Sequence, residues 1–281
     1  MRLRSLLFVP ADRPERFAKA AASGADAIIL DLEDSVAPER KPQARIAASE
    51  WLAAPRATAA FVRVNPLGHH EDVAADLAAV LPHGLDGVVL PKAEGAVSVA
   101  QLLRLAQPHA LPPVLAIATE TPRALFQLGS YDAVAEHLCG LTWGAEDLPA
   151  AIGAATSREA DGRFTPPYEM VRSLALFAAH AAGTAAIETV YPRIDDEAGL
   201  AAYVARARRD GFTGMMAIHP AQVATINAGF SPTENEVARA RAIVSAFADN
   251  PGAGALRVDG MMVDRPHLIQ AQALLARAGE A

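Results

Sequence analysis

The chain has 281 residues, of which 52% are hydrophobic and 20% are charged, and its formal net charge is -7. These values are typical of a globular protein with a large core, and they argue against nucleic acid or an anionic membrane surface as a partner, because no segment concentrates basic residues. The single cysteine, Cys139, excludes an internal disulfide and a cysteine-based metal cluster. No apolar run is long enough for a signal peptide or a membrane-spanning helix, so we expect a cytoplasmic protein.

Short apolar segments of β type recur along the chain and predict eight strands. Most are continuous apolar runs with branched residues, which is typical of strands covered on both faces. The predicted strands are SLLFVP (5–10), AIILDLE (27–33), AAFVRVN (59–65), GVVLPKA (87–93), PVLAIAT (113–119), CGLTWGA (139–145), TAAIETV (184–190) and MMAIHP (215–220).

Longer segments rich in Ala, Leu and Arg lie between the strands and have the spacing of amphipathic helices. They cover residues 14–23, 45–54, 70–81, 96–106, 122–128, 168–183 and 197–211, and TENEVARARAIVSAFADN (233–250) is the helix expected after the eighth strand. Eight such βα units predict a TIM barrel, with a doubly wound open sheet as the alternative. No strand is followed by a G-x-G-x-x-G or Walker glycine pattern, which disfavours a Rossmann or P-loop fold. We expect the barrel to span residues 1–248 and a helical extension to span residues 249–281.

Charged residues follow several of the predicted strands directly. Active sites of TIM barrels lie at the carboxyl ends of the strands, so these residues are expected to meet at one site. They are Asp31, Glu33, Asp34, Arg63, Lys92, Glu94, Glu120, Glu146 and Asp147.

Two of these acids and the arginine suggest the chemistry of the site. Glu120 and Asp147 offer two carboxylates with open positions left for water and substrate oxygens, which suits Mg²⁺. The planar guanidinium of Arg63 is able to grip a carboxylate with two parallel hydrogen bonds. His69 and His70 have no spacing that suits a metal and are interpreted as solvated. A magnesium ion beside an arginine indicates a site for oxo acids.

The same residues belong to eight segments that occur in a fixed order along nearly the whole chain. They are RSLLFVPADRPERFAKA, DLEDSV, FVRVN, GVVLPKAE, AIATET, WGAEDL, GFTGMMAIHPAQV and DGMMVDRPH. Through them the chain resembles the citrate lyase beta-subunit family, within the broader aldolase and citrate lyase superfamily, and is similar to malyl-CoA and citramalyl-CoA lyases. The resemblance implies a TIM barrel that cleaves or forms a carbon–carbon bond in a 3-hydroxyacyl-CoA, with an acyl-CoA and a 2-oxo acid as products.

The resemblance also implies roles for individual residues. Glu120 and Asp147 are expected to hold Mg²⁺, with Glu120 also contacting the substrate, and Arg63 is expected to bind the oxo acid. The remaining expected contacts are the backbone of Gly144, Ala145 and Glu146 for the substrate carboxylate, and Phe8, Arg13 and Lys19 at the CoA entrance.

The C-terminal segment DGMMVDRPH carries a further expectation from the resemblance. Asp264 is the expected acid/base at the acyl-CoA α-carbon, donated to the site of a neighbouring subunit by a tail that closes as a lid. The protein is then expected to be a homo-oligomer, a trimer or a dimer of trimers. The alternative role for Asp264 is to cap a terminal helix just before Pro266.

Three positions depart from the pattern that the resemblance leads us to expect. Glu188 stands where related proteins often have Asp, Met215 where they often have Lys, and Met261 where they often have Lys or Arg. The two methionines remove possible anion contacts, so a free acid or an acyl-carrier prosthetic group is conceivable in place of CoA. His219 is interpreted as a residue that supports the site through hydrogen bonds.

Three alternatives to a CoA-dependent lyase remain open on the sequence. A thioesterase or malate-synthase-like enzyme with the same site would hydrolyse the thioester. A class II pyruvate aldolase would act on free acids without CoA. A non-enzymatic subunit would scaffold a lyase complex, but the joint presence of Glu120, Asp147 and Arg63 argues against a decayed site.

Overall fold

The computed structural model describes residues 1–280. The chain divides into two compact units, Met1–Asn227 and Ala228–Ala281. Each unit has its own core and is described by itself. No helix among the described residues has both the length and the apolar character needed to cross a membrane.

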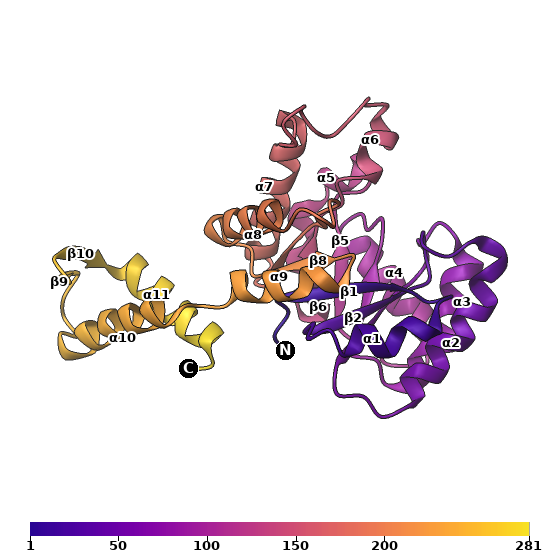
Figure 1. The fold of residues 1–281 in the computed structure, drawn as a ribbon, viewed down its shortest axis with the longest axis horizontal. Coiled ribbons are helices and arrows are strands. Elements are labelled where there is room, and N and C mark those ends of the chain that lie inside the picture. Colours follow the sequence, from indigo (N-terminus) through magenta and orange to yellow (C-terminus); the bar gives the residue numbers. More distant parts are fainter. Residues whose placement is uncertain (281) are drawn as a thin grey trace. The chain divides into compact units, whose positions relative to one another are not determined.

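The first unit is a closed barrel of eight parallel strands, in which each strand pairs with the next (Figure 1). Because Leu6 of the first strand pairs with Met216 of the eighth, the sheet closes and the open-sheet alternative is wrong. The TIM barrel prediction is confirmed, and every predicted strand is present. The strands are β1 (Ser5–Pro10), β2 (Ala27–Asp31), β3 (Ala59–Arg63), β4 (Gly87–Leu90), β5 (Val114–Ile117), β6 (Leu138–Thr142), β7 (Ala185–Glu188) and β8 (Gly214–Ala217).

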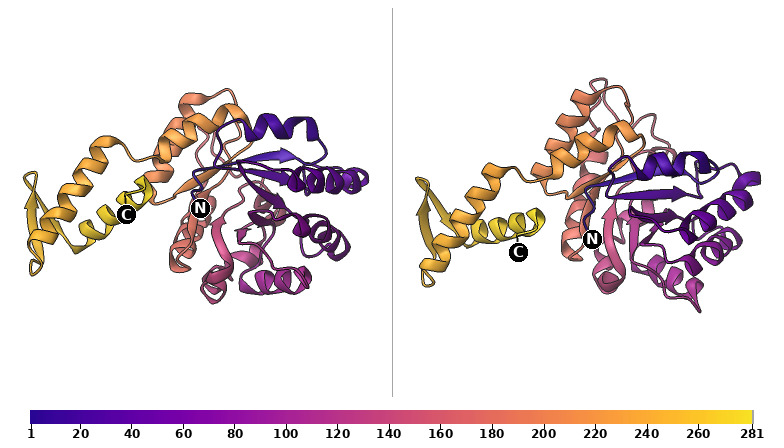
Figure 2. Two further views of the ribbon diagram at one scale, coloured as in Figure 1. Left: turned by 90° about the horizontal axis from the view of Figure 1, so that it is seen from below. Right: turned by 60° about the horizontal axis from the view of Figure 1, so that its bottom comes forward.

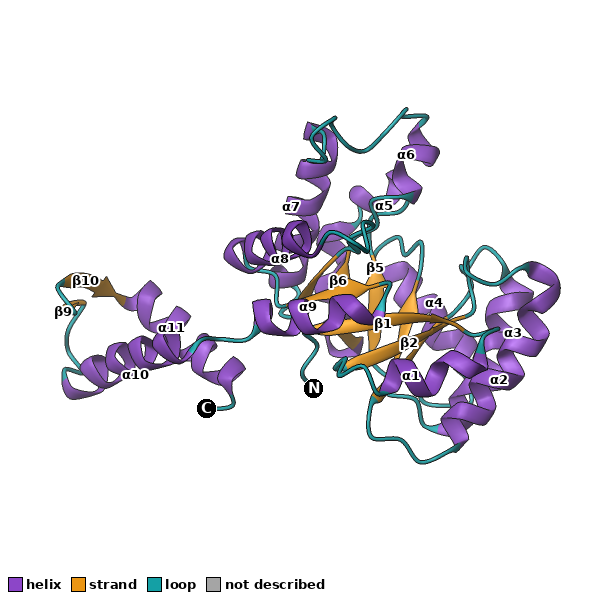
Figure 3. Ribbon diagram, in the orientation of Figure 1, coloured by secondary structure: helices purple, strands orange, loops and turns teal. Residues whose placement is uncertain are grey.

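Helices follow the strands and lie outside them (Figures 2 and 3). A helix over 147–152 was not expected, and the helix predicted over 122–128 is a single turn followed by a 3-10 segment, η4 (Leu128–His137). The helices are α1 (Phe17–Ala21), α2 (Lys41–Ala53), α3 (His70–Val80), α4 (Ala96–Ala106), α5 (Pro122–Leu125), α6 (Asp147–Ile152), α7 (Pro166–Ala181), α8 (Glu197–Asp210) and α9 (Val223–Phe230), the last of which crosses the division between the units.

Apolar side chains fill the interior of the barrel below the carboxyl ends of the strands. Phe61 is the largest of them, and it fits because Gly87 on the adjacent strand has no Cβ, which would lie 2.2 Å from the Phe61 ring. This part of the barrel interior is therefore packed. The cluster comprises Leu3, Leu6, Ala27, Ile29, Phe61, Val89, Leu115, Ile117, Ile187 and Met216.

The second unit consists of α10 (Glu234–Asp249), the hairpin strands β9 (Ala255–Val258) and β10 (Met261–Asp264), and α11 (Arg265–Ala278). Asp259 and Gly260 form the hairpin turn, and both have positive φ angles, as a two-residue hairpin turn with an Asp-Gly sequence requires. The sequence predicts a barrel over residues 1–248, whereas the first unit ends at Asn227. The helix assigned to the eighth βα unit is α10, and its Val237, Ile243 and Phe247 pack in the core of the second unit.

Candidate active site

A cavity of about 380 Å³ opens at the carboxyl ends of the barrel strands. Its wall contains most of the residues predicted from the sequence, because the strands that carry them end at the same rim. The lining residues are Phe8, Pro10, Asp31, Asp34, Ser35, Arg63, Ile117, Glu120, Gly144, Ala145, Glu146, Asp147, Thr189, Val190, Met216 and Ile218.

Arg63 ends β3 and lies over the ring of Phe8, with its guanidinium carbon 4.8 Å from the ring centroid. Its Nε and Nη2 donate to the two carboxylate oxygens of Asp31 at 2.7 and 2.6 Å, and its Nη1 lies 2.8 Å from Glu33 Oε2. The two parallel N–H donors that we expected to bind an oxo acid therefore bind Asp31. A guanidinium has five N–H donors, and Arg63 lines the cavity, so the donors not used in these contacts are left for a ligand.

The ion pair with Asp31 is buried and sets the charge state of both partners. Burial raises the pKa of Asp31, but the hydrogen bonds and charge of Arg63 outweigh burial and hold it below its usual value. Burial likewise lowers the pKa of Arg63, and the contacts with Asp31 and the charge of Glu33 raise it above its usual value. Both groups are charged at neutral pH, and Arg63 is held in one orientation.

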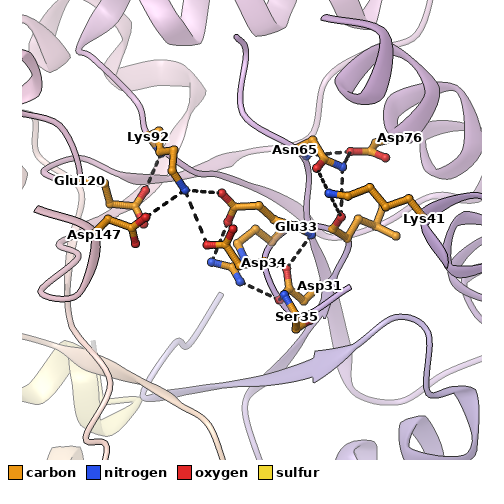
Figure 4. Close-up of polar contacts among 12 residues, drawn as sticks. Asp31, Glu33, Asp34, Ser35, Lys41, Asn65, Asp76, Lys92, Glu120 and Asp147 are labelled. Carbon is orange, nitrogen blue, oxygen red and sulfur yellow. Dashed lines mark hydrogen bonds and ion pairs between the residues drawn. The ribbon is translucent and has the colours of Figure 1, made fainter. Parts of the chain in front are cut away.

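Lys92 lies between two groups of carboxylates at the rim (Figure 4). Its Nζ is 2.6 Å from Glu33 Oε1, 3.6 Å from Asp34 Oδ2 and 3.2 Å from Asp147 Oδ1. Its backbone has a φ of 49°, in the left-handed region that non-glycine residues adopt at a cost of about 1–2 kcal/mol. In that conformation its N–H donates to Glu120 Oε2 at 2.5 Å. Lys92 thus links the carboxyl ends of β2, β5 and β6.

Glu120 is a buried carboxylate that follows β5, with 4% of its surface exposed. Burial and the nearby charges of Glu33 and Asp147 raise its pKa to about 8, although the Lys92 N–H opposes the shift. Among residues 1–280, no lysine, arginine or histidine forms an ion pair with it, because the side chain of Lys92 reaches the other acids instead. A buried carboxylate with this environment favours a cation beside it.

Asp147 begins α6, and the segment before it packs tightly against Glu120. A Cβ on Gly144 would lie 2.6 Å from Glu120 Cγ, so only glycine allows this approach. The Gly144 N–H donates to Thr119 Oγ1 at 3.1 Å, which holds the segment in place. Glu120 and Asp147 consequently line the same cavity.

The donor set fits a magnesium ion better than a transition metal. Within the described part of the chain, no group of three or more His, Cys, Asp or Glu residues is arranged to hold a metal. Mg²⁺ is commonly held by only one or two carboxylates, with water and substrate completing its shell. Five carboxylates face two cations at this rim, so a divalent cation would offset the excess negative charge; the acids are Asp31, Glu33, Asp34, Glu120 and Asp147.

A second cavity of about 380 Å³ lies next to the first and shares Phe8, Pro10 and Ile218 with it. Lys19 of α1, which we expect at the CoA entrance, lines this cavity. Arg16, which has no role expected from the sequence, lines it too. Arg13 does not line this cavity; its Nε lies 3.8 Å from Asp12 and its side chain is about half exposed. His219 lines the cavity and accepts a hydrogen bond from the Ala221 N–H.

Asp264 lies in the second unit, at the start of α11, whereas the cavity belongs to the first. The Asp264 side chain accepts a hydrogen bond from the backbone N–H of His267, so the capping role is present, and His267 Nδ1 lies 2.5 Å from Asp264 Oδ1. The hydrogen bond from His267 lowers the pKa of Asp264, which keeps the carboxylate in its basic form at neutral pH.

The three departures from the expected pattern have different surroundings. Met215 is fully buried in β8 and does not line either cavity, so its sulfur is part of the packing. Met261 is exposed on the hairpin, with its sulfur 3.2 Å from Arg239 Nη2. Glu188 is fully buried behind the wall of the cavity and binds four donors.

Glu33 and Lys92 are expected at strand ends from the sequence, but without a role in the site. Both stand at the centre of the polar contacts in Figure 4. Their charges come from different strands, so only the closure of the barrel brings them together. Their position in the sequence could have pointed to them, because both come just after a buried strand. Glu120 and Asp147 also follow buried strands, and Arg63 ends one.

Known proteins are similar to this chain along nearly its whole length. A profile of the HpcH/HpaI aldolase/citrate lyase family matches residues 4–220. A citrate lyase subunit beta-like protein of Mycobacterium tuberculosis is 42% identical over 275 residues, covering 98% of this chain and 95% of that protein. A (3S)-malyl-CoA thioesterase of Cereibacter sphaeroides is 33% identical over 283 residues, covering 98% of this chain and 94% of that one.

Solved structures give the same result. The crystal structure of the protein CitE from Mycobacterium tuberculosis, in complex with magnesium, acetoacetate and coenzyme A, matches with a TM-score of 0.82 and 40% sequence identity. The match covers 99% of this chain and 98% of that chain.

Proposed function

Because the chain belongs to the HpcH/HpaI aldolase/citrate lyase family, we propose that it is a Mg²⁺-dependent lyase that cleaves a 3-hydroxyacyl-CoA into an acyl-CoA and a 2-oxo acid. The observation that carries the proposal is Glu120, a buried carboxylate beside Asp147 that no lysine, arginine or histidine of residues 1–280 neutralises. The ligands of the CitE structure, which are magnesium, acetoacetate and coenzyme A, support the same combination here.

Cleavage of this kind turns a hydroxyl into a carbonyl and leaves an enolate on the thioester. Glu120 and Asp147 would hold Mg²⁺, which supplies a positive charge at the oxygens of the oxo acid. Arg63, oriented by Asp31, presents its remaining N–H donors to the cavity and stabilises developing negative charge there. A preorganised donor of this type lowers a barrier by roughly 3 kcal/mol. The backbone of Gly144, Ala145 and Glu146 would orient the carboxylate of the oxo acid.

The adjoining cavity suits the rest of the substrate. Arg16 and Lys19 give it positive charge for phosphate groups, and Phe8 separates it from the reacting centre. CoA is the carrier we propose, since the cavity that Lys19 lines meets the first cavity at Phe8, Pro10 and Ile218. Arg13 would contribute from the exposed side of the same segment.

The proposed acid/base at the α-carbon of the acyl-CoA is Asp264. Its carboxylate is ionised at neutral pH, as a base requires. The cavity's own lining contains no residue of the second unit, so we propose that a neighbouring subunit of a trimer or hexamer donates Asp264. Loss of a positioned general base lowers turnover by roughly 10²–10⁴-fold.

Subunit mixing tests this donation. Inactive Asp264→Asn subunits and inactive Arg63→Ala subunits are assembled together, and turnover of the mixed oligomer is measured. We expect partial recovery, because some sites then combine an intact barrel with an intact donated Asp264. Mixed oligomers without any recovery would place Asp264 in its own subunit's site or outside catalysis.

A thioesterase is the second candidate, because the thioesterase of Cereibacter sphaeroides is similar over the whole chain. The two activities differ in their products. Malyl-, citramalyl- and citryl-CoA are each incubated with the protein and Mg²⁺, and both the 2-oxo acid and the free thiol are measured. A lyase releases the oxo acid and an acyl-CoA with no free thiol, whereas a thioesterase releases free CoA. Cleavage of free hydroxy acids without CoA would instead indicate a class II pyruvate aldolase.

A further inference from the structure

Glu188, the last residue of β7, lies outside the cavity in the layer between the barrel and helices α7 and α8. Its neighbour Ile187 belongs to the barrel interior, and successive residues of a strand point to opposite faces, so Glu188 points outward. The side chain is fully buried. Its carboxylate accepts hydrogen bonds from Trp143 Nε1 at 2.5 Å, Tyr203 Oη at 3.0 Å, the Thr189 N–H at 3.0 Å and Arg172 Nε at 2.7 Å.

Two of these four donors belong to segments that line the cavity. Trp143 directly precedes the lining segment from Gly144 to Asp147, and Thr189 is itself a lining residue. The other two donors lie on the surrounding helices, Arg172 on α7 and Tyr203 on α8. One buried carboxylate therefore ties two parts of the cavity wall to the outer layer of the barrel.

The segment after Trp143 has little freedom to move without affecting Glu120. A Cβ on Gly144 would already lie 2.6 Å from Glu120 Cγ, so the two are in close contact as they stand. Asp147 lies three residues further along the same segment. A shift of Trp143 would consequently change the spacing between the two carboxylates of the proposed metal site.

The geometry points to Glu188 as a positioning residue that holds the segment from Trp143 to Asp147, and so sets the separation of Asp147 from Glu120. Glu188 does not touch the cavity and acts only through Trp143 and Thr189. The part of this inference that concerns metal affinity rests on the proposed function, whereas the part that concerns the order of the segment does not.

Two substitutions remove one donor each from the same carboxylate oxygen. Trp143→Phe removes the indole N–H and keeps an aromatic ring against Phe164, whose centroid lies 4.9 Å from that of Trp143. Tyr203→Phe removes only the phenol hydroxyl of Tyr203. Because Tyr203 lies on α8 and not on the segment from Trp143 to Asp147, this variant is the matched control. Glu188→Gln is the third variant, because it leaves the Trp143 ring in place and changes only the carboxylate.

Amide hydrogen exchange of residues 143–148 and Mn²⁺ affinity, followed by electron paramagnetic resonance, are measured for each protein. We expect faster exchange of this segment and Mn²⁺ binding weakened by about 10-fold or more in Trp143→Phe and Glu188→Gln, a loss typical of residues that orient metal ligands. Tyr203→Phe should match the wild type in both measurements.

Equal effects of Trp143→Phe and Tyr203→Phe, or wild-type exchange in Trp143→Phe, would overturn the inference. If Glu188→Gln does not fold, the two phenylalanine variants still decide the question. A wild-type protein that binds no Mn²⁺ would contradict the proposed metal site, and the exchange comparison would then test the role of Glu188 alone.

Discussion

Arg63 serves two purposes with one guanidinium. Its fork pairs with Asp31, which is 2% exposed, and the side chain also lines the cavity, where its remaining N–H donors are left for a ligand. A side chain held on one side by a buried partner loses little further freedom when it binds a ligand on the other. At the scale of single residues, the site is therefore built from pairs in which one member orients the other, as Asp31 orients Arg63 and the Lys92 N–H orients Glu120.

Arg63→Lys should be both inactive and less stable. An ammonium is a point charge and cannot replace two parallel hydrogen bonds to Asp31, so a buried carboxylate is left poorly paired. Breaking a buried pair costs about 3–5 kcal/mol, and lysine keeps part of the attraction, so we expect a loss toward the lower end of that range. Urea unfolding and steady-state kinetics measure the two effects. An Arg63→Lys protein with wild-type kinetics would show that Arg63 is only structural.

Cys139 should be unreactive toward thiol reagents in the folded protein at pH 8. Burial raises the pKa of its thiol to about 12, so the reactive thiolate is scarce at that pH. The rate of modification by Ellman's reagent, compared in native buffer and in denaturant, measures this protection. Reaction in native buffer at the rate seen in denaturant would contradict the raised pKa of Cys139, which packs partly buried against the barrel core.

Among the elements, the junction between β6 and α6 leaves no room for a side chain at Gly144. Gly144→Ala should displace Glu120, because a Cβ there would lie 2.6 Å from Glu120 Cγ. We expect overpacking to cost about 1–3 kcal/mol and the affinity for Mn²⁺ to fall by about 10-fold or more.

Gly129→Ala is the matched control for this substitution, because a Cβ at Gly129 would meet no atom within 4 Å. Mn²⁺ titration and thermal unfolding of both variants test the contact. Equal affinity of Gly144→Ala and the wild type would mean that Glu120 is free to adjust, and the tight packing would then have no bearing on the metal.

The strands were predictable because their signal is local. Each is a short apolar run bounded by charged or turn residues, and the charges at the ends of β3 and β5 identified Arg63 and Glu120 as site residues. The contact of Arg63 with Asp31 and that of Lys92 with Glu33 were not predictable, since each joins different strands and depends on barrel geometry. Helix α6 was missed because its six residues are too few for an amphipathic pattern to appear.

At the scale of the whole molecule, the division after Asn227 shows a limit of the sequence pattern. Helix α10 has the length and period expected of the eighth barrel helix, and only its packing against α11 reveals that it belongs to the second unit. All residues that line the cavity lie in the first unit, whereas Asp264 lies in the second. The residues proposed for metal binding and the residue proposed for proton transfer therefore lie in different units.

Because the cavity and Asp264 lie in different units, one variant should lower turnover and leave Mn²⁺ affinity unchanged. Phe247→Ala removes a buried ring from the core of the second unit, a change that costs about 3–5 kcal/mol in other cores. We expect turnover to fall, because Asp264 loses its support, while Mn²⁺ affinity stays at the wild-type value. Parallel kinetic and titration measurements decide the outcome. A matching loss of Mn²⁺ affinity would show that the metal site depends on the second unit.

We propose that Glu120 and Asp147 hold the divalent cation on which carbon–carbon cleavage depends. Mn²⁺ binding to the wild type, Glu120→Gln and Asp147→Asn, measured by titration alongside release of 2-oxo acid, tests it most directly. Each substitution removes a charge with almost no change in volume, so the fold should persist. We predict one bound Mn²⁺ in the wild type and, in both variants, loss of metal binding together with loss of cleavage. Wild-type cleavage in excess chelator, or variants that bind Mn²⁺ as the wild type does, would contradict the claim.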